Sequence, residues 1–327
     1  MPRLARVRPY DDPGFRRVRA GSGFRYVDGK GRTPPRRHLE RIRALVIPPA
    51  WEDVWISVRP DGHIQAVGID DAGRRQYLYH EVWTAKRDRG KFARALALAE
   101  SLPRARARVT TLLRHSSLDR EHVLAVSFRL LDQAAPRIGA ERYLVRHGSR
   151  GLTTLQRRHA TVDESLVTLS FPGKSGQRQR LEIDDEDLAR SMEVLVIGRP
   201  RSPLLAWSRG RRRVPLTATE VNEYVRSLTG QKFTAKDFRT LRGTILAAEA
   251  LARIGTVDTE RDRKRAEALA VRVTSEALGN TPSVARGSYI DPRVFTRYRD
   301  GHLLDLSIAP ESAIRQLLRP GPGVRGR

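Results

Sequence analysis

The first 85 residues show the alternation of apolar and polar side chains that is typical of short β-strands. Asp-Gly pairs stand between several of the alternating stretches. A period of two places one row of side chains on a core, and Asp-Gly favours the tight turns of hairpins. The pattern therefore predicts a small β-rich domain over residues 1–85, with strands at 24–27, 54–58, 63–67 and 76–79.

After residue 91 the apolar positions recur with the period of helices. The polar and basic stretch 86–91 separates the two patterns and is the best candidate for a linker that acts as a hinge. The pattern predicts helices that begin at capping residues, with a break at Pro103. Their expected ranges are 92–101, 104–115, 119–134, 217–228, 234–252 and 260–278, and a last short helix is expected to start at Pro292.

One β-hairpin interrupts the helical part of the chain. Its strands are expected at 166–171 and 178–183, around a Gly-flanked tip that contains Lys174. Residues 319–327 are rich in Pro, Gly and Arg, and we expect a flexible basic tail there. The fold class that follows is α+β, in which the small β-rich domain precedes a larger, mainly α domain over residues 92–318.

The charge of the chain indicates a polyanionic partner. The 327 residues contain 62 Lys and Arg against 37 Asp and Glu, which leaves a formal net charge of +25. Such a surplus repels itself in a compact protein unless a polyanion neutralises part of it. Nucleic acid is the first candidate, and an anionic membrane surface is the alternative. Because 39% of the residues are hydrophobic, we expect a packed core rather than wholesale disorder.

Several classes of protein are excluded by what the sequence lacks. No apolar run approaches the roughly 20 residues that cross a bilayer, and the N-terminus has no apolar segment of a secretory signal. The absence of cysteine rules out disulfides, a thiolate zinc site and a thiol nucleophile. His63, His80, His122 and His159 show no ligand spacing, so no catalytic metal is expected. These features predict a cytoplasmic protein that works on DNA or RNA and not on membranes.

Three segments hold basic residues where ordinary surface charge does not explain them, at 137–143, 236–244 and 279–292. Together with residues 151–155 and the hairpin tip at Lys174, they resemble the type IB DNA topoisomerases. The resemblance is to the short poxvirus-like branch of bacteria and large DNA viruses. Each string alone is weak, but their joint presence in the order of the family is specific.

The resemblance extends over nearly the whole chain. Residues 47–51 and 73–80 resemble the N-terminal domain of the same branch. The Lys-x-x-Arg string with a downstream tyrosine also resembles the tyrosine recombinases, which use a related catalytic domain. Both resemblances imply the same chemistry, in which a tyrosine attacks DNA.

The resemblance implies that Tyr289 attacks a DNA phosphodiester and forms a 3′-phosphotyrosyl link. The released 5′-hydroxyl strand then swivels about the intact strand and reseals the break. Since the bond energy is kept in the phosphotyrosine, no ATP is expected. The implied activity is that of an ATP-independent isomerase that relaxes positive and negative supercoils by transient single-strand cleavage.

Five further residues match positions of the family's catalytic motifs. Arg137 and Arg239 would clamp the phosphoryl oxygens, because a guanidinium stays charged and binds two oxygens at once. Lys174 would be the general acid for the leaving 5′ oxygen. Asn280 stands where the viral members carry His, and its amide can donate to a non-bridging oxygen. Lys236 would relay the proton of the tyrosine. With this positive charge in place, Mg²⁺ is not expected to be required.

The resemblance also implies contacts to double-stranded DNA outside the reacting phosphate. The expected residues are Gln76, Tyr77, Tyr79, Arg142, Tyr143 and Arg242. Alternation along a strand places Gln76 on the face opposite the two tyrosines that follow it. An amide can bind adenine and a ring can pack on a thymine methyl, but an ordinary edge strand would show the same pattern. The basic run 209–213 fits either a solvated loop or a contact to the DNA backbone.

The family implies a monomeric, nucleoid-associated clamp around duplex DNA, with residues 86–91 as the hinge. A site-specific tyrosine recombinase is the alternative enzyme, although it usually has a C-terminal helix that docks into a neighbour. The Pro- and Gly-rich tail after Leu318 is a poor docking helix. A non-catalytic architectural DNA-binding protein is the alternative from another class, but it would not require these catalytic-type residues.

Overall fold

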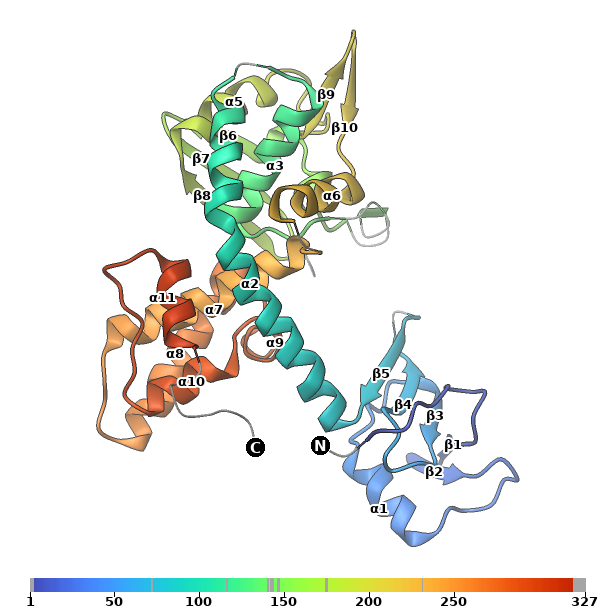
Figure 1. The fold of residues 1–327 in the computed structure, drawn as a ribbon. Coiled ribbons are helices and arrows are strands. Elements are labelled where there is room, and N and C mark those ends of the chain that lie inside the picture. Colours follow the sequence, from blue (N-terminus) through green and yellow to red (C-terminus); the bar gives the residue numbers. More distant parts are fainter. Residues whose placement is uncertain are drawn as a thin grey trace. The chain divides into compact units, whose positions relative to one another are not determined.

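The computed structural model describes residues 3–71, 73–115, 117–139, 141, 144–145, 148–173, 176–230 and 232–319. The chain divides into two compact units, Met1–Gly90 and Lys91–Arg327. The N-terminal unit is built on a β-sheet and the larger unit is mostly helical (Figure 1). The chain therefore has the mixed α and β composition that the sequence pattern predicts.

The N-terminal unit is a five-stranded antiparallel sheet in the order β2-β1-β3-β4-β5. One face of the sheet packs against Ile42 of helix α1 (Arg36–Ala44) through Phe15, Ile56 and Ala66. A second apolar cluster, around Trp55, packs on the other face. The elements are β1 (Gly14–Ala20), β2 (Gly23–Val27), α1 (Arg36–Ala44), β3 (Glu52–Ser57), β4 (Ile64–Ile69) and β5 (Arg75–Tyr79).

The four strands expected in this unit are confirmed as β2, β3, β4 and β5. Strand β1 and helix α1 escaped the sequence analysis because each is rich in arginine. In β1 the one buried side chain is Phe15, and in α1 it is Ile42. One buried residue per element leaves no apolar periodicity to detect.

Helix α2 (Glu81–Leu113) runs through two positions at which the sequence indicated an interruption. Residues 86–91, the expected linker, are helical, and the division between the two units falls after Gly90. The expected break at Pro103 is wrong, because the helix continues past it. Proline removes one backbone hydrogen bond, but apolar residues on both sides of it are buried in the core and hold the helix together.

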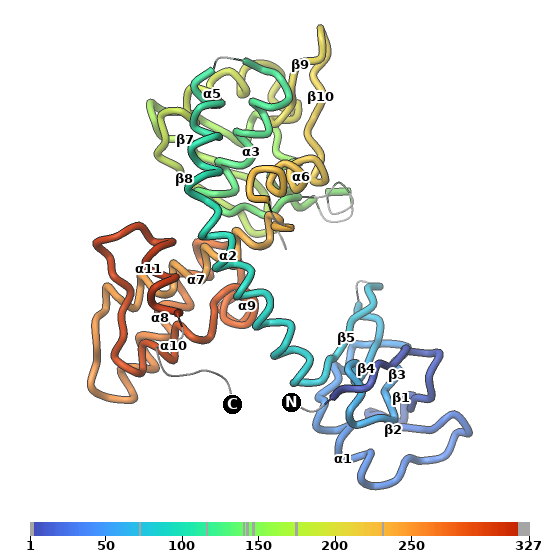
Figure 2. Tube along the Cα trace, in the orientation of Figure 1, coloured from blue at the N-terminus to red at the C-terminus, as the bar shows by residue number. Residues whose placement is uncertain are grey.

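The larger unit contains one hydrophobic core, and α3 and α7 contribute long buried faces to it. Figures 1 and 2 show the path of the chain through this unit. Its helices are α3 (Arg120–Ala134), α5 (Glu186–Val196), α6 (Ala218–Thr229), α7 (Ala235–Ile254), α8 (Glu260–Leu278), α9 (Pro282–Ser288), α10 (Pro292–Arg299) and α11 (Pro310–Leu317). Its strands are β6 (Ala160–Asp163), β7 (Leu166–Pro172), β8 (Arg178–Asp184), β9 (Ala206–Arg209) and β10 (Arg212–Pro215), with 3₁₀ turns at Leu152–Thr154 and Arg157–His159.

Most elements expected in this unit are confirmed. The predicted hairpin is β7 paired with β8, and β6 adds a third strand beside β7. The helices expected at 119–134, 217–228, 234–252 and 260–278 are α3, α6, α7 and α8. The helix expected at Pro292 is α10. The prediction that it is the last helix is wrong, because α11 follows it.

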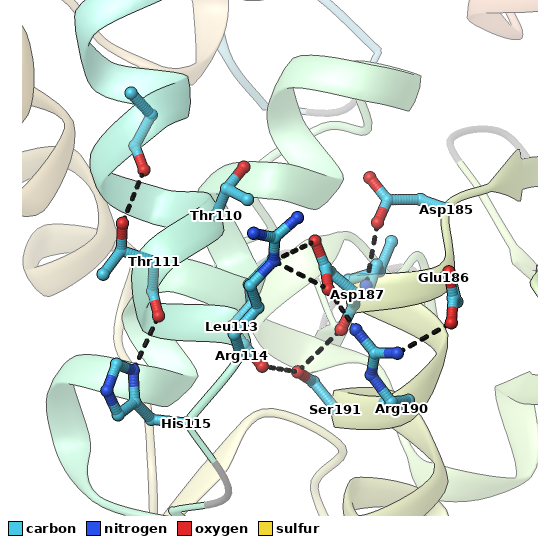
Figure 3. A network of polar contacts seen from close by, with 12 residues as sticks. Thr110, Thr111, Leu113, Arg114, His115, Asp185, Glu186, Asp187, Arg190 and Ser191 are labelled. Atoms are coloured by element: carbon cyan, nitrogen blue, oxygen red, sulfur yellow. Dashed lines mark hydrogen bonds and ion pairs between the residues drawn. The ribbon is translucent and has the colours of Figure 1, made fainter.

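Polar contacts join the end of α2 to the start of α5 (Figure 3). Arg114 Nε lies 3.3 Å from a carboxylate oxygen of Asp187, and Ser191 Oγ donates to the carbonyl oxygen of Leu113 (3.5 Å). Asp185 caps α5 by accepting from the backbone N–H of Leu188 (2.8 Å). Helix α5 also packs against β6 and β7 of the sheet β6-β7-β8, which carries the hairpin of the candidate site.

Candidate active site

Arg137 stands on a short segment that pairs with the backbone around Gly151. Leu152 N–H donates to the carbonyl oxygen of Arg137 (2.8 Å), and Thr153 N–H donates to that of Ile138 (2.9 Å). The segments approach so closely that a Cβ on Gly151 would overlap the Arg137 carbonyl. Two motifs noted separately in the sequence therefore form one backbone unit that holds Arg137.

Arg239, in the second turn of α7, is almost fully buried, with 4% of its surface exposed. Its guanidinium donates to the carbonyl oxygens of Ala135 (2.7 Å) and Leu278 (2.8 Å), at the ends of α3 and α8. The guanidinium carbon lies 4.9 Å from the ring centroid of Tyr289. A permanent positive charge is thus fixed beside the predicted nucleophile.

Asn280 and Arg137 meet just after the C-terminus of α8. Arg137 donates twice to the carbonyl oxygen of Gly279 (3.2 and 3.1 Å) and once to Oδ1 of Asn280. Because Oδ1 accepts this bond, the amide presents Nδ2 as a donor. The amide can therefore donate a hydrogen bond, which is what the resemblance implies for this position.

Tyr289 follows α9, and its backbone lies directly against α7. Its N–H donates to the carbonyl oxygen of Ala285 (3.0 Å), and its own carbonyl oxygen accepts from Thr244 Oγ1 (3.2 Å). A Cβ on Gly243 would lie 2.8 Å from that carbonyl oxygen, so only glycine permits this approach. Gly243 and Thr244 belong to the segment 236–244 singled out in the sequence, but the sequence did not predict their contacts with the backbone of Tyr289.

The pKa of Tyr289 is set by two opposing effects. Burial alone would raise it, but the positive charges of Arg239, Arg137 and Lys236 bring the pKa below its ordinary value. Burial lowers the pKa of Arg137, and the nearby charge of Arg239 adds to this. The surrounding positive charges therefore make ionisation of the Tyr289 hydroxyl easier than burial alone would allow.

Two buried donors in this site point to an anionic ligand. Within the described residues, Arg239 Nε and Asn280 Nδ2 are buried and have no hydrogen-bond partner. An unsatisfied buried donor is costly, and such groups call for an explanation. A phosphate between the guanidinium groups and the amide would satisfy both donors.

Helix α7 is anchored at its first turn, next to exposed Lys236. The carboxylate of Asp237 accepts from the N–H (2.9 Å) and Oγ1 (3.0 Å) of Thr234 and from Arg94 Nε (2.8 Å). The capping pattern Thr-x-x-acid read from the sequence is thus present here. The anchor fixes the helix that carries Lys236 and Arg239.

Arg242 is not brought to the reacting groups. It lines a cavity of about 260 Å³ together with Arg106, Asp132 and Glu311. Arg106 donates to both oxygens of Asp132 (2.7 and 2.9 Å) and forms an ion pair with Glu311. The spacing of three between the two arginines of α7 therefore does not place them in one site.

The three residues expected to contact DNA on β5 lie in the N-terminal unit. The rings of Tyr77 and Tyr79 stack with their centroids 5.9 Å apart, so they share one face of the strand. The amide of Gln76 donates to the carboxylate of Asp70 (2.8 Å). Tyr77 is 40% exposed, which leaves its ring accessible to a ligand.

Three predicted site residues, Lys174, Arg142 and Tyr143, lie outside the described residues. Among the described residues nearest to Lys174, Gly173 N–H donates to the carbonyl oxygen of Gln177 (2.8 Å). In the described part of the chain, no three His, Asp or Glu side chains gather in a way that could hold a metal ion. None of the helices in that part is long and apolar enough to cross a membrane.

Comparison with known proteins identifies the family. The model of the eukaryotic DNA topoisomerase I catalytic core matches residues 80–300, and that of the bacterial DNA topoisomerase IB N-terminal domain matches residues 23–70. These matches cover most of the chain and show that it belongs to the type IB DNA topoisomerases, which are isomerases that act on DNA.

Viral relatives agree with this assignment. The chain is 27% identical over 285 residues to DNA topoisomerase 1B of Acanthamoeba polyphaga mimivirus, which covers 85% of each protein. It is 23% identical over 244 residues to DNA topoisomerase I of monkeypox virus, with 73% of this chain and 74% of the relative covered. The resemblance noted in the sequence to the poxvirus-like branch is thereby confirmed.

Proposed function

We propose that the protein relaxes supercoils of both signs with Tyr289 as the nucleophile. The observation that carries this proposal is the convergence of two guanidinium groups and two unpartnered buried donors beside a tyrosine of lowered pKa. Negative charge gathers on the non-bridging phosphate oxygens during attack, and fixed donors stabilise it without reorganisation. Removing one such donor typically slows the reaction by about 100- to 1000-fold.

In the proposed step, Tyr289 Oη attacks phosphorus and the bond to the 5′ oxygen breaks. Lys174 would give the departing oxygen its proton, and the proton of the tyrosine would leave by way of Lys236. Arg137, Arg239 and Asn280 would hold the non-bridging oxygens. Resealing is the reverse reaction, in which the 5′ hydroxyl attacks the phosphotyrosine. The two phosphodiester-type bonds are equivalent in energy, so ATP is not required and Mg²⁺ is not needed to supply charge.

We further propose that the protein acts as a monomer that closes its two units around duplex DNA in the nucleoid. The contacts of helix α11 with other elements of its own chain support the monomer. Glu311 pairs with Arg106, Arg315 pairs with Glu100 (3.1 Å), and the carbonyl oxygen of Leu318 accepts from Arg293 (3.3 Å).

The test is the relaxation of negatively supercoiled plasmid in EDTA without ATP. Wild type should relax it, and Tyr289→Phe should not, because the substitution removes the attacking oxygen. Tyr224→Phe is the matched control, since the hydroxyl of Tyr224 is buried in the same unit without a hydrogen-bond partner among the described residues. Relaxation by Tyr289→Phe at the wild-type rate would overturn the proposed nucleophile.

A further inference from the structure

Gln179 is a polar side chain at a position where the strand pattern calls for an apolar one. On β8 the side chains of Gln179, Leu181 and Ile183 are shielded, whereas those between them are exposed. Gln179 is paired across the hairpin with buried Phe171. A glutamine on the covered face of a strand loses hydration unless another polar group compensates.

The amide of Gln179 lies against the two backbone segments that define the site. A Cβ on Gly173 would lie 2.5 Å from its Cγ, and a Cβ on Gly279 would overlap its amide group. Gly173 precedes Lys174 in the hairpin, and Gly279 is the residue whose carbonyl oxygen Arg137 binds. The side chain therefore spans from the hairpin of the predicted general acid to the phosphate-binding groups.

The side-chain amide of Gln179 can donate hydrogen bonds beside Gly279. No hydrogen bond of the Gln179 side chain occurs in the part of the chain that the structure describes. Its neighbours around Gly279 are Arg137 and Asn280, and the latter also has an unpartnered donor. Unpartnered donors on neighbouring amides fit a ligand that brings acceptors, such as a phosphodiester.

We propose that Gln179 is a further DNA-contacting residue, whose amide donates to a non-bridging oxygen of the phosphate that Tyr289 attacks. This inference rests on the proposed function and adds one contact to it. The contact also joins the hairpin to the bound phosphate, so that the hairpin is held near the leaving oxygen when DNA is in place.

The experiment compares Gln179→Met with Gln177→Met in single-turnover cleavage of a short duplex. Methionine keeps the length and shape of glutamine and removes the amide. Gln177 is the matched control, because it lies in the same hairpin and its side chain is exposed. Each protein is assayed on a normal scissile phosphate and on each of the two methylphosphonates, in which a methyl group replaces one non-bridging oxygen. Thermal unfolding of each variant accompanies the rates.

We expect Gln179→Met to cleave the normal duplex about 10- to 100-fold more slowly than Gln177→Met, the loss typical of one hydrogen bond to a charged group. On the methylphosphonate that lacks the contacted oxygen, the two variants should cleave at similar rates. Equal rates on the normal duplex would overturn the inference. Equal slowing on all three substrates would also overturn it, because it would indicate packing against Gly279 alone. A wild-type protein without a covalent adduct would overturn the proposed function as well.

Discussion

The backbone at Tyr289 is tied to helix α7 by one hydroxyl group. Thr244 Oγ1 lies 2.8 Å from the carbonyl oxygen of Thr240 and 3.2 Å from that of Tyr289, and it accepts from Asp291 N–H (3.2 Å). Thr244 is almost fully buried, so water does not compete for these bonds. The position of the proposed nucleophile thus depends on a residue that has no role in the proposed reaction.

The lowered pKa of Tyr289 predicts how cleavage depends on pH. Burial opposes ionisation, while Arg239, Arg137 and Lys236 favour it. Substituting Lys236 by Met removes one of these charges and raises the pKa of the tyrosine. The midpoint of the rise in single-turnover cleavage rate with pH should therefore move to higher pH. The measurement is the cleavage rate between about pH 6 and pH 10, the range below the ordinary tyrosine pKa.

Lys232→Met is the control for this prediction, because Lys232 is also an exposed lysine and does not contribute to the shift of Tyr289. Its pH profile should match that of wild type. Superimposable profiles for all three proteins would contradict the role of Lys236 in the ionisation of the tyrosine.

At the scale of elements, one carboxylate joins the three helices around Tyr289. Glu267 of α8 is 4% exposed and accepts from Arg299 of α10 (2.7 and 3.0 Å) and from Arg286 of α9 (3.0 Å). The two arginines are half exposed, so water screens their charges in part. Helix α9, which precedes Tyr289, is held in place through this cluster.

Substituting Glu267 by Gln should lower the free energy of unfolding by about 1 to 3 kcal/mol, because it removes a buried charge between two cations. Urea-induced unfolding measures this change. Glu182→Gln is the control, since Glu182 pairs with Arg180 on the surface and such pairs contribute roughly 0 to 1 kcal/mol. The prediction fails if both variants lose the same stability.

The elements that the sequence predicted well are those with strong local signals. Helix α6 begins at Thr217, whose Oγ1 accepts from the Glu220 N–H (3.2 Å), and α8 begins at Thr259 in the same way. Local caps and an apolar period leave little choice of conformation. The helical path of α2 through Pro103 was not predictable in this way, because burial against distant parts of the chain overrides a local preference.

For the whole molecule, the formal net charge of +25 predicts binding that depends strongly on salt. With about 6 to 10 phosphate contacts, the affinity for duplex DNA should fall about 10³- to 10⁵-fold between roughly 50 and 200 mM salt, because condensed counterions are released on binding. The affinity is best measured with Tyr289→Phe, which we expect to bind without cleaving. A fall of less than about tenfold would contradict extensive phosphate contact.

The sequence by itself determined many of the strands and helices, the partner class and the family. Local periodicity, caps and net charge are properties of the chain as written, and the motifs carry the family. Tertiary structure decided which of these residues meet. Arg239 and Arg242 are three residues apart on α7, yet one lies at Tyr289 and the other in a cavity with Arg106.

The environment of the site was also decided by the fold alone. Arg239 is held by carbonyl oxygens at the ends of α3 and α8, which are distant in sequence. The pKa of Tyr289 depends on burial and on charges from other helices. Such quantities depend on the distances between side chains and on their exclusion from water. These arise only when the chain is packed, so no local pattern encodes them.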